Sequence, residues 1–152
     1  MGMDEFDRNL LAQLQSNCAQ TNAELSERIH LSPSQVSRRR VRLEADGIIA
    51  RQIAVLDGQK LGFDIDVFIR IALTAHDDNT ATKFAKFLKD IGEIYAAFAI
   101  TGDADYLLHI KTRSLADLSA LINHKLLPHP NVREVRSEIV LDRIKEFSPL
   151  DL

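Results

Sequence analysis

The sequence predicts an α+β protein with two domains, because its two halves follow different hydrophobic patterns. In the first 50 residues, apolar side chains recur every three or four positions, which is typical of amphipathic helices. In the second half, short β-prone runs and two helical stretches follow the order β-α-β-β-α-β. A chain of 152 residues is long enough for two small domains. We place a linking segment over residues 51–62, between a first domain of residues 1–50 and a second of residues 63–152.

Two short helices are expected at the start of the first domain. The first covers residues 4–15, where Phe6, Leu10 and Leu14 share one face. The second begins with Asn22 as its cap, or with Thr21 if Thr21 and Glu24 form a capping box. Leu25 and Ile29 then face the interior, and the second helix ends close to residue 30.

A third helix with strong boundary signals follows a turn of about three residues. Ser32 can cap its N-terminus, Pro33 suits its first position, and Gly47 suits the residue just beyond its end. Two helices joined by so short a turn, the second of them well capped, match the helix-turn-helix pattern. The β-prone stretch over residues 48–56 is expected to form a short strand or wing behind it. The first domain is therefore predicted to be a winged helix-turn-helix.

The third helix carries four arginines within five positions, after several short polar residues. Short side chains at a helix N-terminus can reach base edges in the major groove, and arginines behind them can contact phosphates. Taken alone, these arginines are also typical of the solvated face of an ordinary surface helix. With the tight turn before it, we expect double-stranded DNA to bind to Ser32, Ser34, Gln35, Ser37, Arg38, Arg39 and Arg42.

The charge distribution is compatible with a DNA-binding protein although the net charge is −3. Between residues 28 and 51 there are six arginines and only two acids, a local excess of four positive charges. A segregated basic segment can contact phosphates while the acidic remainder stays clear of them. We therefore interpret the distribution of charge, and not its sum, as the informative feature.

The second half is predicted to be a ferredoxin-like domain. Its strands are expected at residues 67–73, 94–100, 106–111 and 132–141, and its helices at residues 80–90 and 115–127. Helices in this arrangement cover one face of the sheet, and an uncovered apolar face is uncommon on a monomer. We expect Phe68, Phe98 and Ile110 on the uncovered face, and a dimer that covers it.

The turn between the second and third strands is a candidate ligand site. Gly102 allows a backbone conformation that leaves N–H groups available for an anion, and Asp103 and Asp105 place carboxylates beside it. Such a turn matches both charges of an amino acid. The alternative is a plain β-turn, in which aspartate and glycine are favoured for local reasons.

Composition argues against several other classes of protein. A single cysteine, Cys18, forms no internal disulfide and fits a reducing cytoplasm, and no cluster of histidine and cysteine has metal-ligand spacing. No apolar run is long enough to span a membrane. Asp103, Asp105 and His109 could serve as an acid–base set, but no nucleophile pairs with a base. We expect no cofactor and no metal, a cytoplasmic protein, and no enzyme.

Short segments that keep a fixed order and spacing are spread over nearly the whole chain, at residues 22–25, 31–34, 38–39, 43–44, 47–49, 54–57, 61–62, 101–106 and 139–141. In this ordered set the chain resembles the Lrp/AsnC family of transcription regulators. Two departures are Arg40, where the family commonly has valine, and Ala104, where an aromatic is frequent.

The resemblance implies a sequence-specific regulator that responds to an amino acid or a related effector. It implies dimers that assemble further, often to octamers, with an effector pocket at the interface between dimers. The effector-contacting residues that it indicates are Thr101, Gly102, Asp103, Asp105, Tyr106 and, where the family often has threonine, Ser137. An architectural DNA-binding protein without an effector is the alternative, since its DNA-binding half would look the same.

Overall fold

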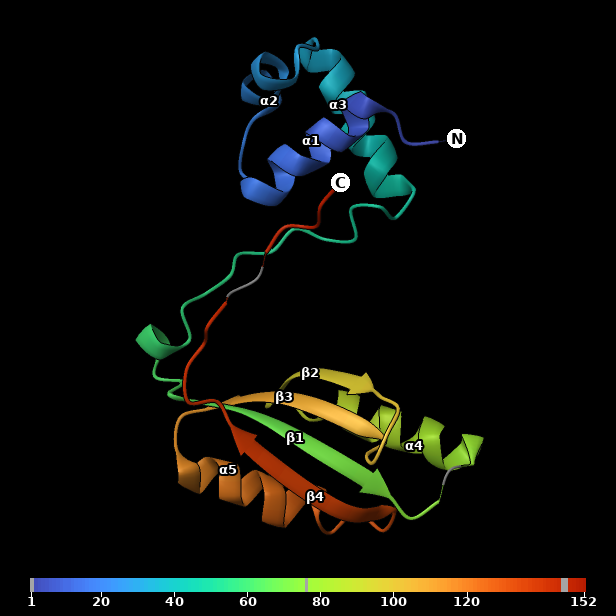
Figure 1. Ribbon diagram of the computed structural model, residues 1–152, viewed down its shortest axis with the longest axis vertical. Coiled ribbons are helices and arrows are strands. Elements are labelled where there is room, and N and C mark those ends of the chain that lie inside the picture. Colours follow the sequence, from blue (N-terminus) through green and yellow to red (C-terminus); the bar gives the residue numbers. More distant parts are fainter. Residues whose placement is uncertain (1, 76, 146–147) are drawn as a thin grey trace. The chain divides into compact units, whose positions relative to one another are not determined.

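The computed structural model describes residues 2–75, 77–145 and 148–152, and it divides into two compact units (Figure 1). The first unit runs from the N-terminus to Val55 and also includes the C-terminal residues from Ile144. The second unit is the continuous segment Leu56–Arg143. The division of residues 51–62 from both domains as a linking segment stays a prediction.

Unit 1 is built from three helices, α1 (Glu5–Ser16), α2 (Asn22–Ile29) and α3 (Pro33–Ala45). One apolar cluster holds them together, with Leu10, Leu25, Val36 and Leu43 almost fully buried. These residues come from all three helices, so the spacing seen in the sequence produces one shared core. The predicted helix-turn-helix arrangement is confirmed.

Side-chain caps define where the helices begin. Thr21, and not Asn22, caps α2. Thr21 forms a capping box with Glu24, which was the alternative prediction from the sequence. Ser32 caps α3 and forms a capping box with Gln35. The turn between α2 and α3 is kept short because His30 adopts a left-handed conformation, with φ of 56°.

The strand or wing expected over residues 48–56 is wrong for this chain. Among the described residues, no strand lies between α3 and the first strand of unit 2, and the only regular element there is a 3-10 turn at Gln59–Leu61. A strand needs a neighbour to receive its hydrogen bonds, and residues 50–57 pair with no strand in the described part of the chain. Ile53, Val55 and Leu56 are consequently exposed.

Unit 2 has the predicted β-α-β-β-α-β order and a four-stranded antiparallel sheet, arranged β2-β3-β1-β4. Helices α4 and α5 pack on the same face of this sheet (Figure 1). The helix expected at 115–127 is divided into α5 and a π-helical turn at Ile122–Leu126. The strands and helices are β1 (Ile65–Leu73), α4 (Asp78–Lys89), β2 (Ile94–Ala99), β3 (Tyr106–Thr112), α5 (Leu115–Leu121) and β4 (Val132–Ile139).

Alternation along the strands separates a covered face from an open one. Val67, Ile69 and Ile71 of β1 point into the core beneath the helices, together with Leu108 and Ile110 of β3. Placing Ile110 on the open face was therefore wrong: it lies opposite Val67 and is fully buried.

The other half of the alternation faces away from the helices. It carries Phe68, Leu107 and His109, together with Phe98, which is 52% exposed. Phe68 and His109 stack with ring centroids 4.7 Å apart. The open face is therefore rich in aromatic groups. Across the described ranges, no helix is both long and apolar enough to cross a membrane.

Candidate nucleic-acid interface and effector turn

Helix α3 buries one face and exposes the opposite one. Val36 and Leu43, seven residues apart, are buried in the core of unit 1. Ser34, Arg38 and Val41 follow each other at spacings of four and three residues, so they share a face. All three are exposed, and Val41 is 62% exposed. This exposed stripe extends back from the capped N-terminus of the helix.

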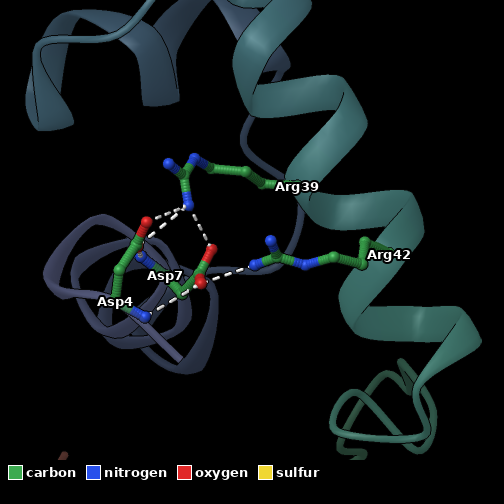
Figure 2. A network of polar contacts seen from close by, with 4 residues as sticks. All are labelled: Asp4, Asp7, Arg39 and Arg42. Atoms are coloured by element: carbon green, nitrogen blue, oxygen red, sulfur yellow. Dashed lines mark hydrogen bonds and ion pairs between the residues drawn. The ribbon is translucent and has the colours of Figure 1, made fainter. Parts of the chain in front are cut away.

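The arginines of α3 have different environments. Arg39 and Arg42 point towards α1, where Asp4 and Asp7 lie at the first turn (Figure 2). Arg40 pairs along its own helix with Glu44 and donates a hydrogen bond to Gln52. Arg38 is exposed and forms no ion pair among the described residues. Among the arginines of α3, and counting the described residues as partners, Arg38 is therefore the one that offers its whole guanidinium to a partner outside the chain.

The contacts between α1 and α3 form a compact α1–α3 ion-pair network of Asp4, Asp7, Arg39 and Arg42. Arg39 Nη1 lies 2.6 Å from Asp7 Oδ1 and 2.8 Å from Asp4 Oδ2. Arg42 Nη2 lies 2.5 Å from Asp7 Oδ2. Asp4 and Asp7 also form the capping box of α1, so the same two carboxylates fix the start of α1 and the orientation of α3.

Asp7 is the centre of this network, because its side chain is completely buried. Burial acts to raise the pKa of Asp7, but hydrogen bonds from Arg39, from the backbone of Asp4 and from Arg42 outweigh it and lower that pKa. The hydrogen bond to Asp7 likewise raises the pKa of Arg39. The carboxylate is thus held ionised inside the unit by two guanidinium groups.

This network was missed by reasoning from the sequence, which assigned Arg39 and Arg42 to DNA alone. The available signal was the pair of aspartates at positions 4 and 7, whose three-residue spacing puts both at one helix N-terminus. Of the other predicted DNA-contacting residues, Ser32, Ser34 and Gln35 are exposed at the start of α3, and Ser37 is partly buried. The Gln35 side-chain oxygen accepts from both the backbone N–H and the hydroxyl of Ser32.

The candidate effector turn lies between β2 and β3. Thr101, Gly102 and Asp103 are exposed there, and Gly102 has φ of 120°, a conformation that side chains other than hydrogen rarely allow. Ala104 is buried behind them. The backbone at Gly102 therefore adopts the kind of turn conformation for which the sequence analysis singled out this glycine.

Asp105 ties this turn to the end of β1. Its Oδ2 accepts a hydrogen bond of 2.7 Å from the Leu73 N–H, and its own N–H donates to the Ile71 carbonyl at 2.9 Å. The Asp105 carbonyl accepts from the Ile100 N–H, which closes the turn. These contacts give Asp105 a role in bracing the turn.

Tyr106 and Ser137 lie on the opposite face of the sheet from Arg70, Tyr106 buried and Ser137 exposed on the edge strand β4. The Tyr106 ring packs on Phe84 of α4, with centroids 5.0 Å apart, and burial raises the pKa of its hydroxyl. Ser137 lies opposite Ile69, whose side chain points into the core. The structure therefore gathers Thr101, Gly102 and Asp103 at one exposed point and leaves Tyr106 and Ser137 elsewhere.

Two arginines that the sequence analysis did not single out accompany Asp103 on the open face. Arg70 Nη1 lies 3.6 Å from Asp103 Oδ1, and Arg136 Nη1 lies 3.5 Å from Asp103 Oδ2. Glu134 and Glu138 are paired with the same arginines. A hollow at this place is lined by Arg70, Ala72, Asp103, Ala104, Glu134 and Arg136. The signal in the sequence was Arg70, a charged residue in the middle of an otherwise apolar strand.

Comparisons with known proteins agree with both halves of this arrangement. Residues 3–44 match the AsnC-type helix-turn-helix domain, and residues 66–150 match the Lrp/AsnC ligand binding domain. The glutamate uptake regulatory protein of Zymomonas mobilis is 32% identical over 150 residues, which covers 99% of this chain and 91% of that protein. The leucine-responsive regulatory protein of Escherichia coli is 31% identical over 148 residues, covering 97% and 90% respectively.

Solved structures give the same result. A transcriptional regulator of Neisseria meningitidis in complex with L-methionine superposes with a TM-score of 0.93 at 33% identity, over 99% of this chain and 97% of that one. An AsnC family transcriptional regulator of Agrobacterium tumefaciens gives a TM-score of 0.90 at 28% identity, over 98% and 97%.

The helix-turn-helix unit and the ligand-binding unit together define a DNA-binding transcriptional regulator, and not an enzyme. Within that class, the chain belongs to the Lrp/AsnC family.

Proposed function

We propose that this regulator binds specific duplex DNA through the exposed stripe of α3 and that an amino acid at the Gly102 turn controls it. The proposal that α3 binds DNA rests on the different environments of its arginines. Arg39 and Arg42 are engaged with α1, whereas Arg38 stands exposed beside Ser34 behind the capped helix N-terminus. Ser32, Ser34, Gln35, Ser37 and Arg38 are then the primary contacts with bases and phosphates.

Arg39 and Arg42 contribute to DNA binding in a second way in this proposal. Their guanidinium groups hold the angle between α1 and α3, and the parts of them that remain exposed add positive potential near phosphates. The dimer presents two copies of α3 to two half-sites, one helical turn or a multiple apart.

The test of the DNA interface compares Arg38→Gln with Arg133→Gln, which removes an exposed arginine from β4 in the other unit. The DNA is a duplex selected by the protein from a random pool, titrated at several salt concentrations. Arg38→Gln should bind more weakly, and its slope of log K against log salt should be shallower by about one. Arg133→Gln should match wild type. Equal behaviour of the two variants would remove Arg38 from the interface.

The proposed effector site rests on the charges beside the Gly102 turn. Asp103 suits an ammonium group, and Arg70 and Arg136 suit a carboxylate, so the three side chains complement both charges of an amino acid. The relative of Neisseria meningitidis described above carries L-methionine, which supports an amino acid here also. Binding between dimers would let the ligand favour one assembly over another, through its different affinity for the two. We propose octamers as the higher assembly.

The effector is identified by a thermal-shift screen against the twenty amino acids, followed by calorimetric titration of each ligand found. Asp103→Asn should lose most of the affinity, and Asp64→Asn, an exposed aspartate of the same unit, should not. Asp103 makes a cleaner test than Asp105, because Asp105 also braces the turn. No binding by any amino acid would favour the alternative of an architectural DNA-binding protein.

We also propose that two chains pair through the open sheet face. Its aromatic groups would lose contact with water in a dimer, which is the usual driving force for such pairing. Sedimentation of the full chain should show a dimer or a multiple of it. Phe98→Glu, on this face, should shift the distribution towards monomers, and Phe6→Glu, an exposed phenylalanine of α1, should not.

A further inference from the structure

Unit 2 contains a groove at the end of the sheet that the effector turn does not use. It has a free volume of about 460 Å³ and lies where β3 ends, beside α5 and the π-helical turn. Phe63 and Leu121 supply apolar surface, and Lys111, Arg113, His124 and Lys125 bring basic groups to its walls. This volume is within the range of small-molecule sites.

The positive charges of this groove are not all neutralised. Lys125 Nζ is 2.5 Å from Glu93 Oε1, and the Asp117 carboxylate accepts from the Ser114 hydroxyl at the start of α5. Lys111 and Arg113, in contrast, form no ion pair within the described part of the chain. Lys111 lies on β3 and Arg113 directly follows its last residue, and both line the groove.

Aromatic rings hold these two cations in place. Lys111 Nζ lies 5.0 Å from the centre of the Tyr95 ring, and the Arg113 guanidinium lies 4.8 Å from the centre of the Phe63 ring. Such contacts orient a cation without neutralising it. The groove therefore contains two pre-positioned cations with no counter-ion among the residues that the structure describes.

The loop before β1 lies beside both cations. A Cβ on Gly62 would stand 3.4 Å from Arg113 Nη1, and a Cβ on Gly58 would stand 3.8 Å from Lys111 Nζ, which are ordinary van der Waals distances. The backbone of Gly62, with φ of +79°, is the feature that favours glycine in this loop.

We propose that this groove is a second small-molecule site, which binds an organic carboxylate with an apolar tail. The carboxylate pairs with Lys111 and Arg113, and the tail lies on Phe63 and Leu121. The site is separate from the Gly102 turn, because the two lie at opposite ends of β3, about 20 Å apart along the seven-residue strand. It does not depend on the proposed effector function.

The test uses the full chain in low-salt buffer and three probes: 4-methylpentanoate, 4-methylpentylamine and inorganic phosphate. Calorimetry should show binding of 4-methylpentanoate, with a far weaker signal for phosphate and none for the amine. Lys111→Gln and Arg113→Gln should each weaken binding by about tenfold or more. Ala120→Trp, an exposed wall residue on α5, should block the groove while every charge remains.

Two controls separate this site from the effector turn and from general loss of charge. Asp103→Asn and Arg133→Gln should both bind 4-methylpentanoate as wild type does. The proposal is overturned by no binding, by equal binding of phosphate or the amine, by unchanged affinity in the two charge variants, or by loss of binding in Asp103→Asn. Thermal melting of each variant confirms that it is folded, and Ala120→Trp gives an independent result if a charge variant does not fold.

Discussion

Unit 1 and unit 2 each contain an aspartate placed between two arginines, and the two clusters differ in burial. Asp7 is fully buried and lies within 2.6 Å of both guanidinium groups. Asp103 is 65% exposed, and its arginines stand 3.5–3.6 Å away. The first cluster is tightly paired around a buried carboxylate, whereas the second is loose and open to water. Burial, more than residue type, decides whether such a trio holds a fold together or is available for binding.

Removing the central carboxylate should destabilise unit 1 far more than unit 2. Asp7→Ala should lower the free energy of unfolding of unit 1 by about 3–5 kcal/mol, because it leaves two guanidinium groups without their buried partner. Asp103→Ala should change the stability of unit 2 by no more than about 0.5 kcal/mol, as expected for an exposed site. Urea denaturation, followed by hydrogen exchange in each unit, measures both effects. Similar losses of unfolding free energy in the two variants would show that burial does not separate the roles of Asp7 and Asp103.

A second substitution compares the roles of Asp105 and Asp103, two aspartates of the same turn in unit 2. Asp105→Ala should lower the free energy of unfolding of unit 2 by about 1.5–3 kcal/mol, because the Leu73 N–H loses a charged acceptor. Asp103→Ala, two residues away, is the matched control. Hydrogen exchange of the Leu73 amide should speed up in the first variant and stay unchanged in the second. Equal exchange in both would show that Asp105 does not brace the turn.

Lowering the pH should remove the contribution of ionised Asp7 to the free energy of unfolding without a change of sequence. Because the pKa of Asp7 is lowered in the folded state, its contribution is fully present above its unfolded-state pKa, about 3.9. It is lost as the pH falls through the lower folded-state value. Between pH 6 and pH 3, wild type should therefore lose more stability than Asp7→Asn does, by a fraction of the effect of Asp7→Ala. Parallel urea-denaturation curves across this range would show that Asp7 does not titrate with unfolding.

Features that depend on neighbouring residues could be read from the sequence. The Ser32 cap, Pro33 and Gly47 fix the limits of α3 locally, and the β-α-β-β-α-β order follows from hydrophobic spacing. The positive φ of Gly102 could be anticipated in the same way, because glycine readily adopts the turn conformation that the sequence predicted there.

Features that depend on distant residues could not be read in the same way. Asp7 meets Arg39 and Arg42 across 32 and 35 residues, and only the packing of α1 on α3 brings them together. The faces of Ile110, Tyr106 and Ser137 depend on strand register, where a shift of one residue reverses every side chain. The linking segment has strand-forming residues but lacks a neighbouring strand, and propensity alone does not supply one.

The end of the chain adds a long-range contact to unit 1, beyond its three helices. Gln15, near the end of α1, exchanges two hydrogen bonds with the backbone of Leu150, 2.7 and 3.1 Å long and 135 residues apart in the sequence. Removal of the last five residues would leave both polar groups of the Gln15 side chain to water, and α1 would lose a partner that only the complete fold of unit 1 brings to it.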